Sequence, residues 1–271
     1  RYSCCGEALL MRPVTLCFSG LDPSGGAGLQ ADIESIASLG GHAAVIATAL
    51  TVQDSQRVYD FQLTAPALMR EQAKRVLSDL PVACIKLGML GSAAAVKCVF
   101  DSLAEFRHLP VVMDPVLSAN SGGTLAQQDL RAAILDALPL ATIITPNTVE
   151  ARLLADCDDL TEAVAKLTKA GAQNIWLKGG HEPGNDLVNS LYRQGELILR
   201  SSLPRLAGEF HGSGCTLAAA LAAGLAAGLS LVDAIEQSQA FVEKALTLAD
   251  RPRADGQWLP KRIHSIWERE V

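Results

Sequence analysis

The chain has 271 residues, of which 49% are hydrophobic and 19% charged, so it can bury one sizeable core or two small ones. Its 23 Lys and Arg against 29 Asp and Glu give a formal net charge of −6, which argues against nucleic acid as a partner. With 22 Gly and only 4% aromatic residues, the composition favours tight turns around a small ligand and fits a metabolic enzyme.

Short apolar runs alternate with segments of helical period along most of the chain. The pattern predicts strands followed by helices, in this order: strand 14–18 and helix 30–39; strand 42–50 and helix 67–80; strand 83–87 and helix 93–105; strand 111–113 and helix 127–138; strand 142–144 and helices 148–155 and 161–170. A strand at 175–177 then opens a hairpin through 190–192 and 196–199. Such alternation predicts an α/β fold with a mostly parallel sheet and helices on both faces, in three layers.

The final third is predicted to be helical. One helix spans 214–227, Gly228 breaks it, and a capping box from Ser230 to Asp233 opens the next. The apolar run 217–229 is too short to span a membrane, so we expect no membrane partner. The first ten residues have no signal pattern and Met11 is a plausible start, so we interpret 1–10 as an extension and 11–271 as one domain.

The seven Cys are odd in number and contain no CxxC pair. Several lie in apolar runs, where a free thiol acts as a small hydrophobe. This usage predicts a reduced, cytoplasmic protein.

Polar, Gly and Pro residues follow five of the predicted strands. Because ligands of open parallel sheets bind beyond the carboxyl ends of the strands, we expect these segments to form one site. They are 19–28 (SGLDPSGGAG), 86–91 (KLGMLG), 114–116 (DPV), 145–150 (TPNTVE) and 178–181 (KGGH).

The segment 210–216 (FHGSGCT) runs directly into the long Ala-rich helix. Free backbone amides of Gly212, Ser213, Gly214 and Cys215 would then form an anion site able to stabilise a transferring phosphoryl group. A Gly-rich helix start capped by Ser213 is the alternative. The helix field should lower the pKa of the Cys215 thiol and make it a base or nucleophile, unless it is an inert buried thiol.

Further side chains are candidates on chemical grounds. Asp32, after the Gly-rich loop 23–28, would accept a hydrogen bond from a small polar molecule or remain solvated. Glu150, with Asn147 and Asp114, suits Mg²⁺ held by carboxylates and water, although a first-turn Glu is also ordinary helix chemistry. Lys178 would reach nucleotide phosphates or lie in solvent.

Gln53 both donates and accepts hydrogen bonds, as reading an aminopyrimidine edge requires; the alternative is a solvated loop residue. His211 is interpreted as a neighbour that shapes the anion loop. The other four histidines, His42, His108, His181 and His264, lack metal-ligand spacing, and no metal is assigned to them.

Taken together, these segments resemble the hydroxymethylpyrimidine/phosphomethylpyrimidine kinase family of the ribokinase-like superfamily. The motifs GLDPSGGAGLQADI, TALTVQD, KLGMLGS, DPV, TPNTVEA, LKGGH and HGSGCT occur in the family's order between residues 14 and 248. The resemblance implies a ribokinase-like fold, a dimer, and two successive phosphorylations of an aminopyrimidine alcohol by ATP, which yield the diphosphate used for thiamine.

The resemblance also implies roles for particular residues. Cys215 would be catalytic, and Gly212, Ser213 and Gly214 would form the anion hole. The remaining roles are as follows: Gln53, Gly20, Asp32, Met89 and Val116 around the pyrimidine; Asn147 and Lys178 at the ATP phosphates; Glu150 and Asp114 at Mg²⁺.

Two departures from the family pattern stand out. The segment 118–121 (SANS) has no Lys where many relatives carry one, and the usual Gln-Asn pair is Gln53-Asp54 here. Three alternatives remain open: a pyridoxal or pyridoxine kinase, a hydrolase or acyltransferase that uses Cys215 with His211, and a silent ligand-sensing module.

Overall fold

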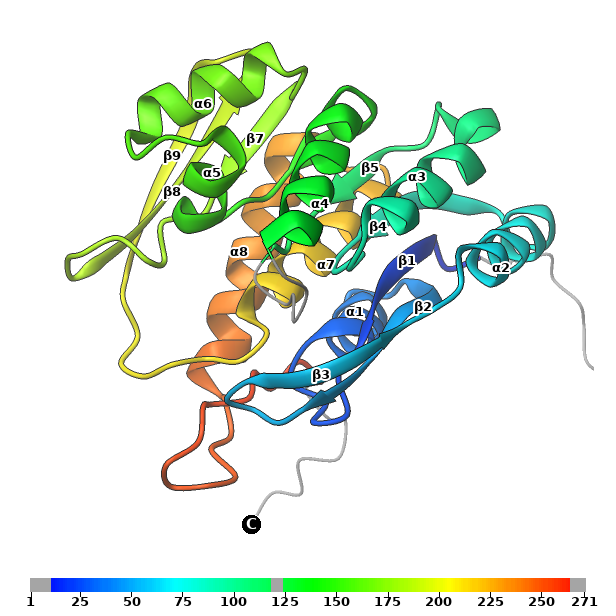
Figure 1. Ribbon diagram of the computed structural model, residues 1–271. Coiled ribbons are helices and arrows are strands. Elements are labelled where there is room, and N and C mark those ends of the chain that lie inside the picture. Colours follow the sequence, from blue (N-terminus) through cyan, green and yellow to red (C-terminus); the bar gives the residue numbers. More distant parts are fainter. Residues whose placement is uncertain (1–10, 118–123, 264–271) are drawn as a thin grey trace, which may run out of the picture.

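A single nine-stranded sheet runs through the described part of the chain, residues 11–117 and 124–263 of a computed structural model (Figure 1). The strand order is β3-β2-β1-β4-β5-β6-β7-β8-β9. The predicted extension 1–10 and the departure at 118–121 lie outside the described residues. The strands are β1 (Val14–Leu21), β2 (His42–Gln53), β3 (Val58–Leu63), β4 (Val82–Leu87), β5 (Val111–Met113), β6 (Ile143–Ile144), β7 (Asn174–Leu177), β8 (Asp186–Arg193) and β9 (Glu196–Pro204).

The predicted strands are confirmed, and β1, β2, β8 and β9 are longer than predicted. The six central strands, β2-β1-β4-β5-β6-β7 in spatial order, pair in parallel. The outer strands β3, β8 and β9 pair antiparallel with their neighbours. Strand β3 was not predicted. Its Tyr59, Phe61 and Leu63 do alternate with polar residues, but it is an edge strand whose pairing with β2 supplies its hydrogen bonds.

Helices cover both faces of the sheet, as predicted. Helices α2 to α6 pack on one face in a cluster with Leu16, Phe18 and Ile85, while α1, α7 and α8 pack on the other with Cys17 and Cys84 (Figure 1). The helices are α1 (Gly28–Ser38), α2 (Pro66–Asp79), α3 (Ala93–Ser102), α4 (Thr124–Ala137), α5 (Thr148–Ala155), α6 (Leu160–Lys169), α7 (Ser213–Ala226) and α8 (Leu231–Thr247), with 3-10 turns η1 (Ala104–Phe106) and η2 (Leu138–Leu140).

Small residues let α7 lie deep in the molecule. Its residues from Thr216 to Gly224 are all buried, and a Cβ at Gly224 would lie 3.0 Å from the Cβ of Ala234 on α8. The break at Gly228 is confirmed by its left-handed backbone, with φ at 84°. Ser230 caps α8: its hydroxyl accepts from the Asp233 amide and donates to the Asp233 carboxylate.

No helix in residues 11–117 or 124–263 has both the length and the apolar character to cross a bilayer.

Candidate functional site

A pocket of about 290 Å³ opens at the carboxyl edge of the parallel strands. Every residue singled out from the sequence except Asp32 lines it: Gly20, Gln53, Met89, Asp114, Val116, Asn147, Glu150, Lys178, Gly212, Ser213, Gly214 and Cys215. The segments that follow β1, β4, β5, β6 and β7 therefore meet where an open sheet binds its ligands.

Asp32 does not line the pocket, contrary to the prediction. Its side chain is fully buried and pairs with Lys86, whose Nζ lies 2.8 Å from Oδ1. Lys86 comes from β4, where it alternates with Ile85 and Leu87 and so faces α1 and α7. A sequence motif marks Asp32 as polar, but only the packing of α1 against the sheet reveals that this carboxylate is sealed beneath the site.

The anion loop begins α7 as predicted, although Ser213 is not its cap. The cap is Gly212, which has φ at 79° and makes no side-chain cap hydrogen bond. A Cβ at this position would collide with the Gly26 carbonyl oxygen, so glycine is required. Because no side chain caps the helix, the amides of Ser213, Gly214 and Cys215 are left for a ligand.

The expected activation of Cys215 is wrong in direction. Burial raises the pKa of its thiol above the ordinary value of 9.0, and the Lys86 charge only partly opposes this. Loss of hydration on burial disfavours the charged thiolate. At neutral pH the group is therefore a thiol.

Lys178 and Asp114 form an ion pair at the wall of the pocket. Lys178 Nζ lies 2.8 Å from Asp114 Oδ1, and Thr145 Oγ1 donates to the same oxygen at 2.8 Å. Burial would raise the pKa of Asp114, but the charges of Lys178 and Lys86 and these hydrogen bonds lower it below 3.8. Burial would likewise lower the pKa of Lys178, yet Asp114 and Glu150 raise it. Both groups are thus charged at neutral pH.

Asn147 and Glu150 open α5 through a reciprocal capping box. The Asn147 side chain accepts from the Glu150 amide at 2.8 Å, and Glu150 Oε2 accepts from the Asn147 amide at 2.8 Å. Burial raises the pKa of Glu150 to about 7. Since the cap uses Oε2, it leaves Oε1 as the oxygen available to a ligand.

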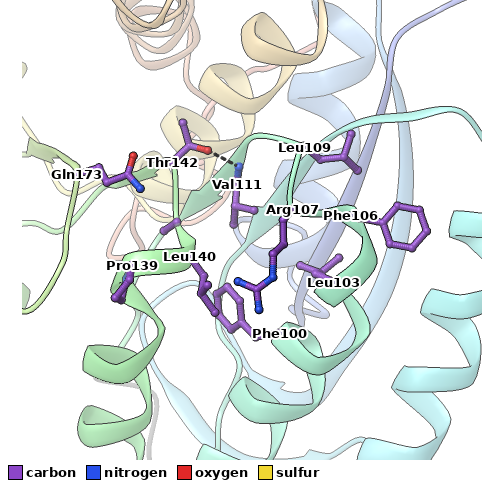
Figure 2. A pocket seen from close by; sticks show the side chains of 11 residues that line it. Phe100, Leu103, Phe106, Arg107, Leu109, Val111, Pro139, Leu140, Thr142 and Gln173 are labelled. Atoms are coloured by element: carbon purple, nitrogen blue, oxygen red, sulfur yellow. Dashed lines mark hydrogen bonds between the residues drawn. The ribbon is translucent and has the colours of Figure 1, made fainter.

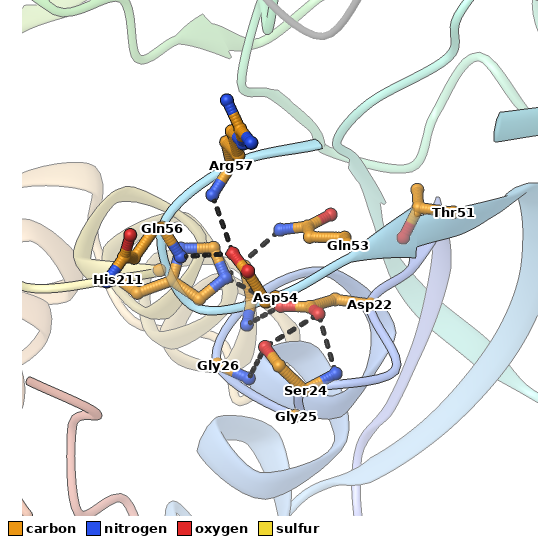
Figure 3. Close-up of polar contacts among 12 residues, drawn as sticks. Asp22, Ser24, Gly25, Gly26, Thr51, Gln53, Asp54, Gln56, Arg57 and His211 are labelled. Carbon is orange, nitrogen blue, oxygen red and sulfur yellow. Dashed lines mark hydrogen bonds and ion pairs between the residues drawn. The ribbon is translucent and has the colours of Figure 1, made fainter. Parts of the chain in front are cut away.

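The pocket contains two further polar residues, Asp22 and His211 (Figure 3). Asp22 was not predicted as a site residue, and His211 was predicted only to shape the anion loop. His211 Nε2 lies 2.7 Å from Asp22 Oδ2 and 3.1 Å from the Gln53 side-chain nitrogen. The sequence does carry a signal for Asp22. In Asp-Pro-Ser, the Ser24 amide donates to Asp22 Oδ1 at 2.8 Å, which is the Asx turn that such a sequence favours.

A second pocket, of about 230 Å³, lies at the opposite edge of the sheet (Figure 2). Residues that precede β5, β6 and β7 line it, including Leu109, Thr142 and Gln173, and Phe100, Phe106 and Arg107 complete its wall. None of the residues singled out from the sequence is among them. This edge lacks the convergent acids, lysine and free amides of the first pocket.

The fold and the first pocket define an α/β protein with a helix start suited to an anionic group, beside a charged lysine and two carboxylates. The phosphomethylpyrimidine kinase family model matches residues 22–258. The chain belongs to this family.

Individual relatives agree. The hydroxymethylpyrimidine/phosphomethylpyrimidine kinase of Rhizobium meliloti is 34% identical over 267 residues, which cover 95% of this chain and 100% of the relative. The thiamine biosynthesis bifunctional protein of Geobacter sulfurreducens is 37% identical over 245 residues, 88% of this chain and 50% of the relative. The chain thus spans about half the length of that bifunctional relative.

Solved structures confirm the ribokinase-like α/β prediction. Pyridoxal kinase from Staphylococcus aureus has a TM-score of 0.83 at 26% identity, covering 95% of this chain and 96% of that one. Phosphomethylpyrimidine kinase from Clostridium difficile has a TM-score of 0.73 at 27% identity, covering 87% and 100%.

Proposed function

We propose that the chain transfers the γ-phosphoryl group of ATP to the hydroxymethyl group of 4-amino-5-hydroxymethyl-2-methylpyrimidine, and then to the resulting monophosphate. The observation that carries this proposal is the meeting of the free amides at the start of α7, the charged Lys178 and the amide side chain of Gln53 in one pocket. The choice of substrate is supported by relatives of the chain that are named as phosphomethylpyrimidine kinases.

In this reaction the hydroxymethyl oxygen attacks the γ-phosphorus, and the bond to the bridging oxygen of ADP breaks. Amides of Ser213, Gly214 and Cys215 would hold the transferring group, while Lys178 and Asn147 would hold the ATP phosphates. Cys215 would take the hydroxyl proton. Because its thiolate is the minority form at neutral pH, we expect the amides and Lys178 to contribute more to the rate than proton removal does.

Gln53 would hydrogen-bond to the aminopyrimidine. Gly20, Met89 and Val116 also line the pocket and would contact its ring. A Cβ at Gly20 would lie 3.2 Å from the Met89 sulfur, so glycine at this position leaves room for the Met89 side chain.

The pocket fits Mg²⁺ as a partner of bound ATP. Asp114 and Glu150 supply carboxylate oxygens, and no group of three or more His, Cys, Asp or Glu able to hold a metal occurs in residues 11–117 or 124–263. Mg²⁺ usually binds through one or two carboxylates, waters and substrate phosphates, which is the donor set this pocket offers. When bound, the ion would neutralise phosphate charge.

Product analysis tests the proposal most directly. The protein is incubated with MgATP and the aminopyrimidine alcohol, and in parallel with pyridoxal, and the products are separated by anion-exchange chromatography. We expect the pyrimidine monophosphate and then the diphosphate. Turnover of pyridoxal alone would support the second candidate, which the TM-score of 0.83 to a pyridoxal kinase favours. Binding without any product would indicate a silent ligand-binding module.

Two variants test the assigned roles. Cys215→Ala should lower kcat about 100-fold with little change in KM for the pyrimidine, the usual scale for a lost proton-transfer group. Gln53→Ala should chiefly raise KM. Cys157→Ala and Gln56→Ala are matched controls, because both residues lie outside the pocket lining. The reverse pattern would contradict these roles.

The hydrolase alternative has little support in the contacts of His211. Its Nε2 bonds to Asp22 and faces Gln53, so this nitrogen is not free to activate Cys215. Acylation of Cys215 without ATP, seen by mass spectrometry, would revive that alternative.

We also propose a homodimer in the cytoplasm. The exposed apolar side chains of β2 and β3, among them Leu50, Val52 and Tyr59, support an interface there. The cysteines of the described residues are free thiols, which fits a reducing compartment. Light scattering should give twice the chain mass; a monomer at micromolar concentration would contradict the dimer.

A further inference from the structure

The Nε2 nitrogen of His211 faces two partners (Figure 3). One of them, a carboxylate oxygen, needs a hydrogen-bond donor, and the other, an amide nitrogen, needs an acceptor. Nε2 lies 2.7 Å from a carboxylate oxygen of Asp22 and 3.1 Å from the end of the Gln53 amide. A ring nitrogen that carries a proton donates, and one without a proton accepts; it does not do both. The state of Asp22 therefore decides what Gln53 can offer.

Asp22 is held as an ionised acceptor. Its Oδ1 accepts from the Ser24 amide at 2.8 Å and from the Ser24 hydroxyl at 2.7 Å, and its Oδ2 accepts from the Ala27 amide at 2.9 Å. Burial would raise the pKa of Asp22, but the hydrogen bonds from His211 and Ser24 lower it below its ordinary value. An ionised carboxylate only accepts, so Nε2 of His211 carries a proton.

The imidazole is also fixed in place. A Cβ at Gly26 would collide with Cδ2 of the His211 ring, so the ring lies directly on that backbone. The His211 amide donates to the Trp258 carbonyl at 2.9 Å, which anchors the main chain just before the anion loop. With the ring clamped, its Nε2–H keeps one direction.

A protonated Nε2 is mismatched with an amide nitrogen at 3.1 Å, because both groups donate. The oxygen and nitrogen of an amide have nearly the same shape, and the hydrogen-bond network decides which one occupies which place. The matched arrangement turns Oε1 of Gln53 toward His211, where the single Nε2–H donates mainly to Asp22 at 2.7 Å and Oε1 is a second, weaker acceptor, and it turns the NH₂ group to the pocket that Gln53 lines.

We propose that Asp22 acts through His211 to orient the Gln53 amide, so that its NH₂ group donates to an acceptor nitrogen of the substrate ring. Asp22 and His211 are then positioning residues, and Gln53 is the residue that touches the substrate. This deepens the proposed function and rests on it. It predicts that the pocket selects a ring nitrogen with a lone pair at this point, not the exocyclic amino group.

The test is equilibrium binding without nucleotide, measured by isothermal titration calorimetry. The ligands are the aminopyrimidine alcohol and its two deaza analogues, in which one ring nitrogen at a time is replaced by C–H. Wild type should bind one analogue at least about 10-fold more weakly than the parent, because the Gln53 donor then loses its partner. Asp22→Asn, which frees the His211 tautomer, should reduce this discrimination to about twofold.

A double-mutant comparison separates positioning from a general loop effect. In a Gln53→Ala background, Asp22→Asn should cost no further affinity, because the amide it orients is gone. His211→Phe keeps a ring against Gly26 but removes the donor, so it should lose discrimination as well, and it serves if Asp22→Asn does not fold. Asp54→Asn is the matched control, since Asp54 accepts hydrogen bonds from Gln56 and Arg57 of the next turn and from Tyr59 on β3.

The outcomes distinguish this inference from the function on which it rests. A protein that phosphorylates the alcohol but binds all three ligands equally overturns the inference alone. Losses from Asp22→Asn and Gln53→Ala that simply add also overturn it. A protein that neither binds nor phosphorylates the alcohol overturns both.

Discussion

Two buried lysine–aspartate pairs lie at this site, with the same separation and different surroundings. Lys86 and Asp32 are 2.8 Å apart with both side chains 0% exposed, whereas Lys178 and Asp114 are 2.8 Å apart with 13% and 3% exposed. The first pair is sealed between the sheet and α1; the second lines the pocket.

Their hydrogen bonds differ as well. Asp114 also accepts from Thr145, and Lys178 retains donors that face the pocket. Asp32 pairs with Lys86, and Ser19 is a further side chain whose hydrogen bond lowers the pKa of this carboxyl. Equal geometry thus serves two ends: the sealed pair neutralises buried charge, while the open pair keeps donors for an anionic ligand.

Removing Lys178, the lysine of the pair that lines the pocket, should have the largest effect on activity. Lys178→Met removes the charge nearest the phosphate site, and we expect kcat/KM to fall about 1000-fold, by analogy with other cations at phosphoryl-transfer sites. Steady-state kinetics with the pyrimidine alcohol measure it, and Lys97→Met, on an exposed helix face, is the control. A loss of less than tenfold would show that the open pair is structural like the sealed one.

Removing the sealed lysine should act on folding. Lys86→Met leaves the buried Asp32 carboxyl without its cation, which should lower the free energy of unfolding by about 3–5 kcal/mol. The double variant Lys86→Met, Asp32→Leu should recover most of this, because both charges are gone. Urea denaturation followed by circular dichroism measures both. If the double variant is as unstable as the single one, the loss comes from packing and not from the unpaired charge.

The two pairs also show what the sequence can and cannot predict. Lys178 and Asp114 were found because each follows a predicted strand, and the carboxyl ends of parallel strands meet at one edge. Lys86 and Asp32 have the same residue types and lie in equally clear motifs. Whether a polar side chain on a strand or helix faces a ligand or the core depends on how α1 packs across β4, which local pattern does not contain.

The same limit explains the other differences. The helix start at Gly212 followed from glycines and an Ala-rich run, which are local signals. The Asp22–His211 contact joins residues 189 apart in the chain, and β3 is defined by pairing with β2. Likewise, the raised pKa of Cys215 reflects burial by distant segments, whereas the sequence displays only the helix start.

A smaller loss is expected from the wall of the open pair. Thr145→Val keeps the shape but removes the hydroxyl that donates to Asp114, and a buried hydrogen bond to a charge contributes about 1.5–3 kcal/mol. We expect a loss of stability in that range and a fall in kcat/KM of about tenfold, because Asp114 then keeps only its hydrogen bond with Lys178. Thr145→Ser, which keeps the hydroxyl, should be close to wild type; equal losses in both variants would point to the methyl group instead.

The smallest effect should be on the reactivity of Cys215. Lys86 and Asp32 do not line the pocket, so they act on this thiol only through the electrostatic effect of their charges. Only the thiolate is alkylated, and burial raises the pKa of this thiol above 9.0, so the iodoacetamide rate should be slow at pH 7 and still rising above pH 9. The Lys86 charge lowers this pKa more than Asp32 raises it, so Lys86→Met, Asp32→Leu should slow alkylation a few-fold at pH 8. Peptide mass spectrometry separates Cys215 from the other thiols, with Cys157 as the internal reference. An alkylation rate of Cys215 that is already at its plateau at pH 7 would contradict this prediction. It would mean that the helix start lowers the thiol pKa more than burial raises it, so that Cys215 is a thiolate at neutral pH.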